Sequence, residues 1–487
     1  MTELTLAIDQ STQGTKVLLI DHEGTIKYKT TRTHRQLISP EGWISHDLTE
    51  IQANLKALVH LALAHAKGAT VTSVAISNQR ETAAAWSRSS GEPLALAIVW
   101  QDNRAKELVD ELVAKPESGT IKMKTGLNLS PYFTGAKFAW LLIHNAVVRT
   151  AQSRGDLCFG TIDSWLVSVL TNGDSFKTEP SNACRTQLMD LNTGTWDQSL
   201  CDLFGIDQNE LPQIIDSDGI FGKTDLFGEL NHSIPITSVL GDSQAALYAE
   251  GCHSPGQFKV TFGTGSSIML NTGEEKIRSE TGLNTSIAWR KRGQTTYVLE
   301  GNVNYSGAVI TWLKNNLAII GDPAETDCMA QAADPNDTTC LVPAFSGLAA
   351  PYNRPEMKAA FVGMTMLTGK NELVRASLDA VVFQIADIVQ LLQDQSPDLE
   401  PIIHVDGGMI CNHYLMQFLA DIAQRQVIIS PVQELSGVGA ALNGFDSFPI
   451  KETHTERYSP EISTDLAEQR AGHWRKVITQ LQTTEGV

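Results

Sequence analysis

The chain has 487 residues, of which 42% are hydrophobic and 19% are charged, a composition typical of folded globular proteins that excludes wholesale disorder. Its 55 Asp and Glu outnumber its 37 Lys and Arg, and the resulting net charge of −18 argues against nucleic acid as a main partner. A chain of this length predicts two or three domains.

The N-terminus lacks a basic segment followed by an apolar one, so no signal peptide is predicted. The most apolar short stretch, Ala57–Ala66, is about half the length that a bilayer requires and predicts a core-facing helix, so no membrane partner is expected. Seven cysteines are scattered without a C-x-x-C pair, which argues against disulfides and zinc and favours a reducing cytoplasmic location.

Two similar strand–turn–strand units are predicted far apart in the chain. The first has apolar runs at 4–8 and 17–20 around a polar turn of small residues. The second has apolar runs at 258–262 and 268–270 around the turn at 263–267. Such repetition predicts a duplicated core with one copy in each half, residues 1–240 and 241–487.

A third glycine turn, Gly407-Gly408, lies between a predicted strand at 402–406 and a predicted helix at 412–423. This arrangement presents backbone amides to an anion. A long helix is predicted over 372–393, because its apolar residues recur at spacings of three and four. Strands alternating with helices in both halves predict an α/β architecture.

The first turn offers backbone amides and side-chain donors to a phosphate, from Thr12, Gln13, Gly14 and Lys16. Small residues also form ordinary hairpin turns, and for one turn alone that interpretation is favoured. Three such turns, each after a strand, favour phosphate binding. Neither a Walker motif nor a G-x-G-x-x-G follows a strand here, so a dinucleotide fold is disfavoured.

Two aspartates lie at the ends of predicted strands. Asp9 is suited either to a hydrated Mg²⁺ on nucleotide phosphates or to an Asx turn, and the two roles are compatible. Asp242 precedes a helical run, where it is expected either to be an N-cap or to accept a proton from an attacking hydroxyl.

A polar cluster, Asn78-Gln-Arg80-Glu81, follows an apolar strand. Adjacent Arg and Glu are usually surface residues, but together these side chains suit the chelation of vicinal hydroxyls. Trp100 and Tyr132 add aromatic rings beside polar residues, as polyol and sugar sites often do.

These landmarks together resemble the FGGY family of carbohydrate kinases, and within it the glycerol kinases, from Asp9 to about Gly444. The segments that carry the resemblance include Gly42–Asp47, Asn78–Thr82, Ala97–Gln101, Pro131–Gly135, Phe159–Trp165, Ser181–Thr186, Gly241–Leu247, Phe262–Gly265, Leu341–Gly347 and Asp406–Gly408. The resemblance implies a duplicated actin-like, ribonuclease H-like fold whose halves flank a central cleft.

The resemblance also implies roles for individual residues. The positions that match the acceptor site are Arg80, Glu81, Trp100, Tyr132 and Asp242, with Asp242 as the catalytic base. The positions that match the nucleotide site are Thr12, Thr264, Gly307, Thr311, Gly408 and Asn412, and Asp9 matches the residue near the metal. Gln13, Gly14 and Lys16 stand where the family commonly has Thr, Ser and Arg.

Three positions depart from the glycerol kinases. Ser11 replaces a glycine in the first turn, Ser243 replaces a glutamine that reaches a substrate hydroxyl, and Ser267 replaces a phenylalanine packed on the polyol carbons. Loss of a side chain that buries about 150–250 Å² is expected to open space in the acceptor site.

The resemblance therefore implies phosphoryl transfer from Mg²⁺-ATP to a primary hydroxyl of glycerol or a similar small polyol, in a protein that is expected to form dimers or tetramers. A kinase for a four- or five-carbon polyol or ketose is the nearest alternative. An actin-type or chaperone-type ATPase switch is the alternative from another class, although it would need no polyol cluster. A catalytically inactive sugar sensor is disfavoured, because no expected chemical residue is missing.

Overall fold

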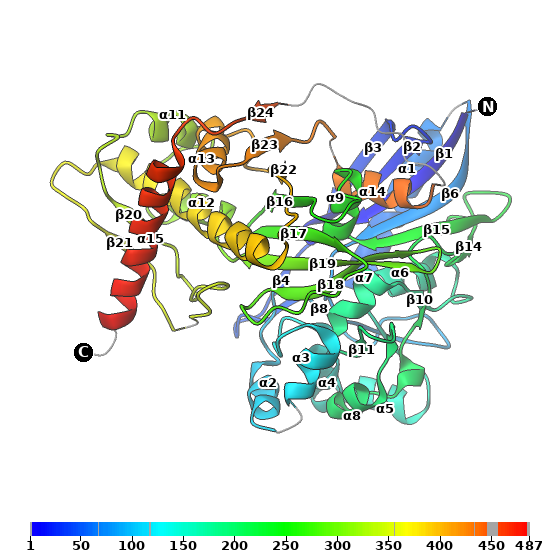
Figure 1. Ribbon diagram of the computed structural model, residues 1–487. Helices are drawn as coiled ribbons and strands as arrows, with labels where there is room; N and C mark the ends of the chain where they lie inside the picture. The colour runs from blue at the N-terminus through cyan, green and yellow to red at the C-terminus, as the bar shows by residue number, and fades with distance from the viewer. Residues whose placement is uncertain are drawn as a thin grey trace.

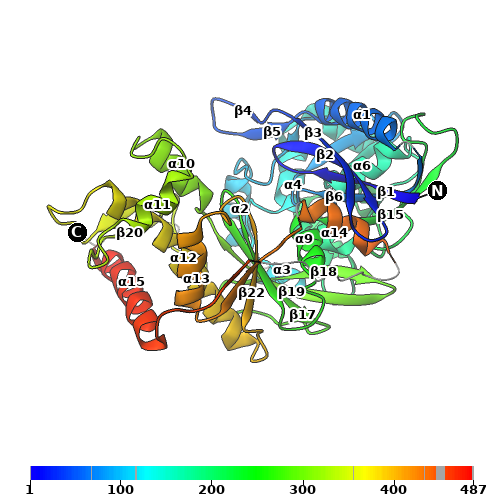
Figure 2. The same cartoon turned by 90° about the horizontal axis from the view of Figure 1, so that it is seen from above.

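Two sheets, each with helices packed on it, form the framework of the protein in a computed structural model (Figures 1 and 2). The structure describes residues 2–66, 68–115, 118–354, 356–432, 434–445 and 456–484.

The first sheet has six strands in the order β14-β15-β6-β1-β2-β3. Strand β1 is antiparallel to β2 and parallel to β6, and β6 is parallel to β15. The strands are β1 (Thr2–Gln10), β2 (Gly14–Asp21), β3 (Ile26–Thr33), β6 (Ala69–Asn78), β14 (Gly222–Thr224) and β15 (Ile234–Gly241).

The second sheet has seven strands in the order β18-β19-β17-β16-β22-β23-β24. Strand β16 is antiparallel to β17 and parallel to β22, as β1 is to β2 and β6, so the predicted duplication of the core is confirmed. The strands are β16 (Phe258–Phe262), β17 (Ser266–Gly273), β18 (Asn284–Lys291), β19 (Gln294–Val303), β22 (Ile402–Gly407), β23 (Gln426–Ile429) and β24 (Arg457–Tyr458).

Amphipathic helices cover the sheets and bury the apolar face of each. On the first sheet, α1 (Leu48–His65) and α6 (Ile162–Leu170) enclose a core that includes Leu55 and Trp165. On the second sheet, α12 (Lys370–Gln395) and α13 (His413–Ala423) do the same. The three predicted helices are confirmed, each within a few residues except that α1 begins earlier. Helix α12 is long and apolar enough to cross a membrane, but 78% of its apolar window is buried in the protein.

Two helices connect the halves. Helix α9 (Asp242–Ala249) follows the first sheet, and α14 (Leu435–Asn443) follows β23 of the second sheet but packs back on the first. The two helices touch closely, since a Cβ atom added at Gly439 of α14 would lie 1.8 Å from the carbonyl oxygen of Ala245 in α9. They share one apolar core with strands of both sheets.

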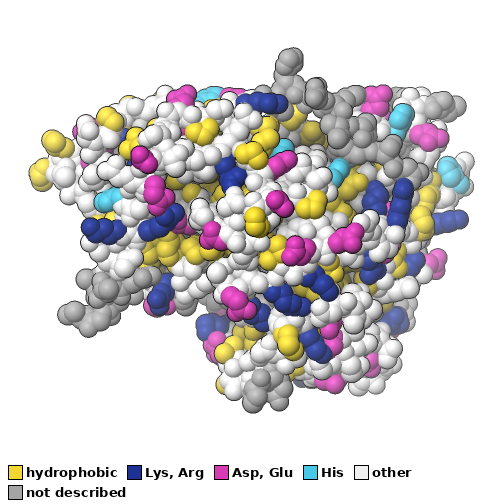
Figure 3. Space-filling model, in the orientation of Figure 1, with side chains coloured by type: hydrophobic (Ala, Val, Ile, Leu, Met, Phe, Trp, Pro, Cys, Tyr) yellow, Lys and Arg dark blue, Asp and Glu magenta, His cyan; other side chains and the backbone are white. Residues whose placement is uncertain are grey.

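Further helices are inserted between β6 and β15 and have an apolar core of their own, which appears in cyan and green at the bottom of Figure 1. These are α2 (Lys106–Val113), α3 (Ser118–Thr125), α4 (Thr134–His144), α5 (Ala146–Ser153) and α8 (Gln198–Phe204). The short helix α7 (Pro180–Ala183) is also inserted there but packs against β18. The second half adds α10 (Gly307–Asn315), α11 (Glu325–Gln331) and α15 (Thr464–Thr484). Acidic and basic side chains are interspersed over the face shown in Figure 3.

Candidate active site

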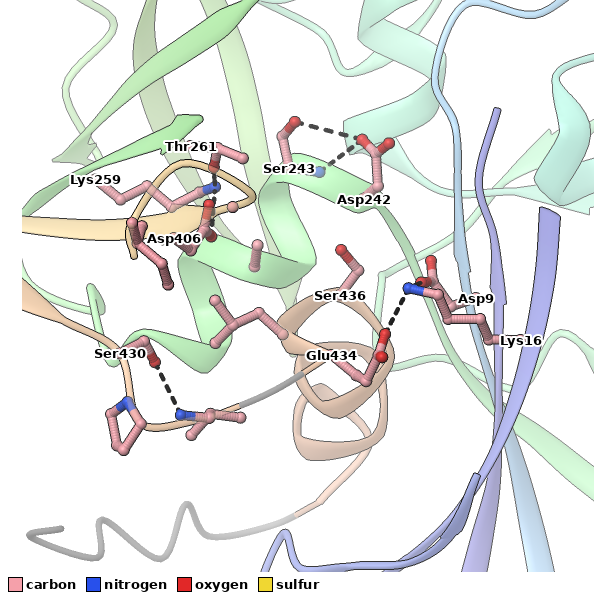
Figure 4. Close-up of a pocket in the computed structure, with 16 residues that line it drawn as sticks. Asp9, Lys16, Asp242, Ser243, Lys259, Thr261, Asp406, Ser430, Glu434 and Ser436 are labelled. Carbon is pink, nitrogen blue, oxygen red and sulfur yellow. Dashed lines mark hydrogen bonds and ion pairs between the residues drawn. The ribbon is translucent and has the colours of Figure 1, made fainter. Parts of the chain in front are cut away.

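A cavity of about 650 Å³ lies between the two sheets, where the first hairpin, the connecting helices and the second sheet meet (Figure 4). Its lining comes from both halves: Asp9, Lys16, Asp242, Ser243, Ala246, Lys259, Thr261, Asp406, Gly407, Ile410, Ser430, Pro431, Val432, Glu434, Leu435 and Ser436. Four of the residues singled out in the sequence, Asp9, Lys16, Asp242 and Ser243, are therefore on one cavity.

On one wall, Lys16 lies between two carboxylates. Its Nζ is 2.5 Å from Glu434 Oε2 and 3.6 Å from Asp9 Oδ2. Burial raises the pKa of Asp9 to about 6, although Lys16 opposes the shift. Oδ1 of Asp9 has no hydrogen-bond partner among the described residues, and the hairpin is closed instead by Ser11, whose backbone N–H donates to Gly14 O at 2.9 Å. The Asx-turn interpretation of Asp9 is thus not observed, and Oδ1 is a buried, unpartnered oxygen of a residue that lines the cavity.

On the opposite wall, Lys259 of β16 is fully buried and pairs with Asp406 at 3.5 Å (Figure 4). Its Nζ also donates to the hydroxyl of Thr261. Oδ1 of Asp406 is a second buried carboxylate oxygen without a partner among the described residues. Each wall thus combines one lysine with one aspartate that has an unpartnered carboxylate oxygen.

Asp242 is the first residue of α9, where β15 ends. The N-cap of α9 is Gly241, so the N-cap interpretation of Asp242 is wrong. Its Oδ1 accepts the backbone N–H of Ser243 at 2.7 Å and lies 3.5 Å from Arg80 Nε. Burial raises the pKa of Asp242, while Arg80 opposes the shift. A carboxylate that is one-third exposed and not locked in a tight ion pair is suited to take a proton.

The predicted Arg80–Glu81 pair lies beside Asp242 in a buried cluster of charges. The Arg80 side chain packs against Gly241, where an added Cβ atom would lie 2.8 Å from Arg80 Cγ and Cδ. Glu81 adopts φ = 58°, a conformation that costs free energy for a residue other than glycine and often marks a functional site. Its carboxylate accepts from Arg185 Nε, and Glu300 of β19 binds both Arg80 and Arg185.

The two predicted aromatic residues lie together. The rings of Trp100 and Tyr132 are 5.6 Å apart in an edge-to-face arrangement, and Arg185 lies 6.0 Å from the Tyr132 ring. Trp100 Nε1 donates to Thr12 Oγ1 at 2.9 Å, which ties this wall to the first turn. Behind it, the buried Lys137 donates to the carbonyl oxygens of Glu81 and Tyr132. Burial lowers the pKa of Lys137 to about 7.

Three segments assigned to the nucleotide meet at the second turn. The N–H of Gly307 donates to Gly263 O at 3.0 Å, that of Gly408 to Phe262 O at 2.9 Å, and that of Ser306 to Thr264 O at 2.9 Å. The close backbones leave no room for a side chain at Gly307, where an added Cβ atom would lie 2.7 Å from Gly263 O.

The three remaining candidates for nucleotide binding either already bind other protein atoms or are exposed. Asn412 caps α13 by accepting the Leu415 N–H, and its Nδ2 donates to Thr326 Oγ1, so both of its amide atoms have protein partners. Thr311 lies on the exposed side of α10 and donates to Gly307 O. Gln13 is exposed at the tip of the first turn.

We expect Gly407→Ala to destabilise the protein by several kcal/mol, about 3 or more. Gly407 has φ = 103°, and a Cβ atom there would lie 2.1 Å from Phe262 O. Thermal melting measures the loss. Gly408→Ala is the matched control for stability, since a Cβ atom there has nothing within 4 Å, and its melting temperature is expected to stay close to that of the wild type. Equal melting temperatures for the two variants would contradict the argument.

Sequence reasoning gave no role to several residues of the site. These are Arg185, Lys259, Glu300, Asp406, Ser430, Glu434 and Ser436. A signal existed for two of them, because Lys259 and Glu300 are single charged residues inside apolar strands, and buried charges require partners. The serines carry no such signal.

Comparison with known proteins gives the site its context. Residues 4–249 match the N-terminal domain of the FGGY family of carbohydrate kinases, and residues 258–446 match the C-terminal domain. The chain belongs to this family. It is therefore an ATP-dependent carbohydrate kinase with the two-domain FGGY fold, as the resemblance in the sequence implied.

Relatives of this FGGY kinase match nearly its full length. It is 39% identical to glycerol kinase 1 of Thermotoga maritima, over 98% of this chain and 99% of that one, and 38% identical to glycerol kinase of Brucella ovis, over 98% of each. The crystal structure of Plasmodium falciparum glycerol kinase with ADP superposes with a TM-score of 0.91 at 33% identity, covering 99% of this chain and 98% of that one. Xylulose kinase of Lactobacillus acidophilus superposes with a TM-score of 0.87 and 99% coverage of both chains, but at 20% identity it shows the fold alone.

Proposed function

We propose that this kinase transfers the γ-phosphoryl group of ATP to a primary hydroxyl of glycerol or a similar small polyol. The observation that carries the proposal is the position of Asp242, which lines the cavity with Asp9 and also lies against Arg80 of the buried charge cluster. The glycerol kinases among its relatives support the same acceptor.

In this proposal, the acceptor lies against Arg80, Glu81, Trp100 and Tyr132, with one hydroxyl at Asp242. Asp242 takes the proton of that hydroxyl while its oxygen bonds to the γ-phosphorus, and the bond between that phosphorus and the oxygen of the ADP leaving group breaks. Backbone amides of the turns near Thr12 and Thr264 hold the phosphates. The other residues that bind the nucleotide in this proposal are Gln13, Gly14, Gly307, Thr311, Gly408 and Asn412. Lys16 and Lys259 offset the negative charge of the phosphates.

The cavity also suits a hydrated Mg²⁺. The unpartnered oxygens of Asp9 and Asp406 are hard ligands of the kind that Mg²⁺ prefers. Three His, Cys, Asp or Glu side chains do not converge on one point among the described residues, so phosphate oxygens and water would complete the coordination. When bound, the ion neutralises phosphate charge.

An acceptor panel tests the proposed function. ADP release is measured with glycerol, with four- and five-carbon polyols, with five-carbon ketoses and without an acceptor. We expect glycerol or its nearest homologues to give the highest kcat/KM. Turnover only with ketoses would favour the alternative within the family, and ATP hydrolysis that ignores every acceptor would favour an ATPase switch.

Two serines bear on acceptor length. Ser267 is half-buried and donates to Glu300 Oε1 at 3.4 Å, and Ser243 donates to Asp242 Oδ1 at 3.3 Å, so both small side chains flank the charge cluster. We expect Ser267→Phe to raise the preference for glycerol over a five-carbon polyol by about ten-fold or more, because it fills space that extra carbons would occupy. The ratio of kcat/KM for the two acceptors measures this. An unchanged ratio would mean that Ser267 does not limit acceptor length.

The same proposal includes a domain boundary near residue 240, with domains 1–240 and 241–487, a cytoplasmic location, and self-association into dimers or tetramers. Light scattering of the purified protein tests the oligomeric state.

A further inference from the structure

Glu300 is a buried carboxylate at the centre of the acceptor cluster, but it comes from the other half of the molecule. It lies on β19, which is hydrogen-bonded to β17 on one side and β18 on the other. Its side chain is fully buried. A side chain on an inner strand of a sheet has a well-defined position, so Glu300 is a fixed point to which the two long arginine side chains bind.

Both oxygens of Glu300 bind arginine. Oε1 accepts from Arg80 Nη2 at 2.9 Å, and Oε2 accepts from Arg80 Nη1 at 3.3 Å and from Arg185 Nη1 at 2.6 Å. Ser267 contributes a longer bond of 3.4 Å to Oε1. The two arginines hold the pKa of Glu300 at about 2 despite its burial, so the group is ionised throughout the pH range in which an enzyme is assayed.

These contacts decide what the arginines offer to the rest of the site. Glu300 accepts from both Nη atoms of Arg80, of which Nη1 also donates to Gln244 Oε1 at 3.4 Å, and Arg80 Nε lies 3.5 Å from Asp242. Arg185 likewise uses Nη1 for Glu300 and Ser286 and Nε for Glu81. Its Nη2 is buried and has no partner among the described residues.

We propose that Glu300 is the positioning residue of the acceptor site: it holds Arg80 and Arg185 against the acceptor and keeps Arg80 from forming a two-pronged ion pair with Asp242. Without it, Arg80 keeps, among the described residues, only the long bond from Nη1 to Gln244 Oε1 at 3.4 Å, and its guanidinium can turn toward Asp242, the other carboxylate within 4 Å. A planar guanidinium binds a carboxylate through two parallel bonds when nothing prevents it. The base would then be neutralised and the acceptor would lose its donors. This inference rests on the proposed roles of Asp242 and Arg80.

The test is steady-state kinetics of Glu300→Gln, with acceptor and ATP varied separately. We expect the KM for the acceptor to rise at least ten-fold and kcat to fall by about 10- to 100-fold, while the KM for ATP stays within about two-fold of the wild type. A purely structural role would change both KM values together or neither.

Asp216→Asn is the matched control. Asp216 forms another ion pair between the halves, with Arg290 of β18 at 2.5 Å, and it does not line the cavity. The substitution therefore removes one negative charge from an ion pair away from the acceptor site. Its acceptor KM is expected to stay at the wild-type value. If Glu300→Gln changes the acceptor KM no more than Asp216→Asn does, the inference is wrong.

Glu300→Asp serves if the glutamine variant does not fold. It keeps the charge but shortens the side chain by one methylene, so it is expected to fold and still to raise the acceptor KM about ten-fold. A wild-type acceptor KM in this variant would overturn the inference. The wild-type protein in the same assay tests the proposed function separately, because failure to phosphorylate any acceptor there would refute that function whatever the variants do.

Discussion

Asp242→Asn is expected to lower kcat by about 10²- to 10⁴-fold, with little change in the binding of ATP or acceptor. The amide keeps the size of the side chain and its contact with the Ser243 N–H, but it cannot take the proton of the attacking hydroxyl. Single-turnover kinetics at saturating substrates measures the chemical step directly.

Binding and stability serve as controls for this variant. Because burial raises the pKa of Asp242, removal of its charge is not expected to lower the melting temperature. Calorimetric titration with ATP and acceptor is expected to give dissociation constants within a few-fold of the wild type. A variant that retains most of its turnover would show that another group takes the proton.

Asp9→Asn is expected to have opposite effects on activity and on stability. Activity is expected to fall on the order of 10²-fold or more, because in the proposed function this carboxylate faces the phosphates and their metal. The free energy of unfolding is expected to rise by about 1–3 kcal/mol at pH 7–8, because the folded protein no longer carries a buried charge whose pKa is raised to about 6.

The dependence on pH distinguishes this cause from others. The folded state holds the Asp9 proton up to about pH 6, whereas the unfolded chain releases it near 3.8, so the wild type loses stability as the pH rises between these values. The advantage of Asp9→Asn should therefore be small near pH 4, grow up to about pH 6–7 and stay constant above it. Chemical denaturation at several pH values without nucleotide or Mg²⁺ measures it, and an advantage independent of pH would contradict the explanation.

Local patterns predicted most of the fold. Apolar runs on either side of small turns predicted both hairpins. The spacing of Val374, Leu378 and Val381 predicted the long helix, because a helix that buries one face has apolar residues at regular intervals in its sequence. Pattern also placed Asp242 at a junction of strand and helix. Pattern left open whether Asp242 caps the helix, and the structure excludes that role, because Gly241 adopts the cap conformation and needs no side chain to do so.

Local sequence patterns did not predict the contacts between distant parts of the chain. Arg80, Arg185 and Glu300 are separated by more than 100 residues each, and the sequence gives the charges without their partners. The return of α14 to the first sheet likewise brings Glu434 to Lys16, although no local feature of either segment indicates it. Such pairings follow from topology, which local periodicity does not specify.

The close packing of Gly439 on Ala245 limits how the molecule can open. The backbones of the two connecting helices touch there, and even a methyl group at residue 439 would overlap Ala245. We therefore expect α9 and α14 to move as a single unit when a nucleotide enters or leaves the cavity that both helices line.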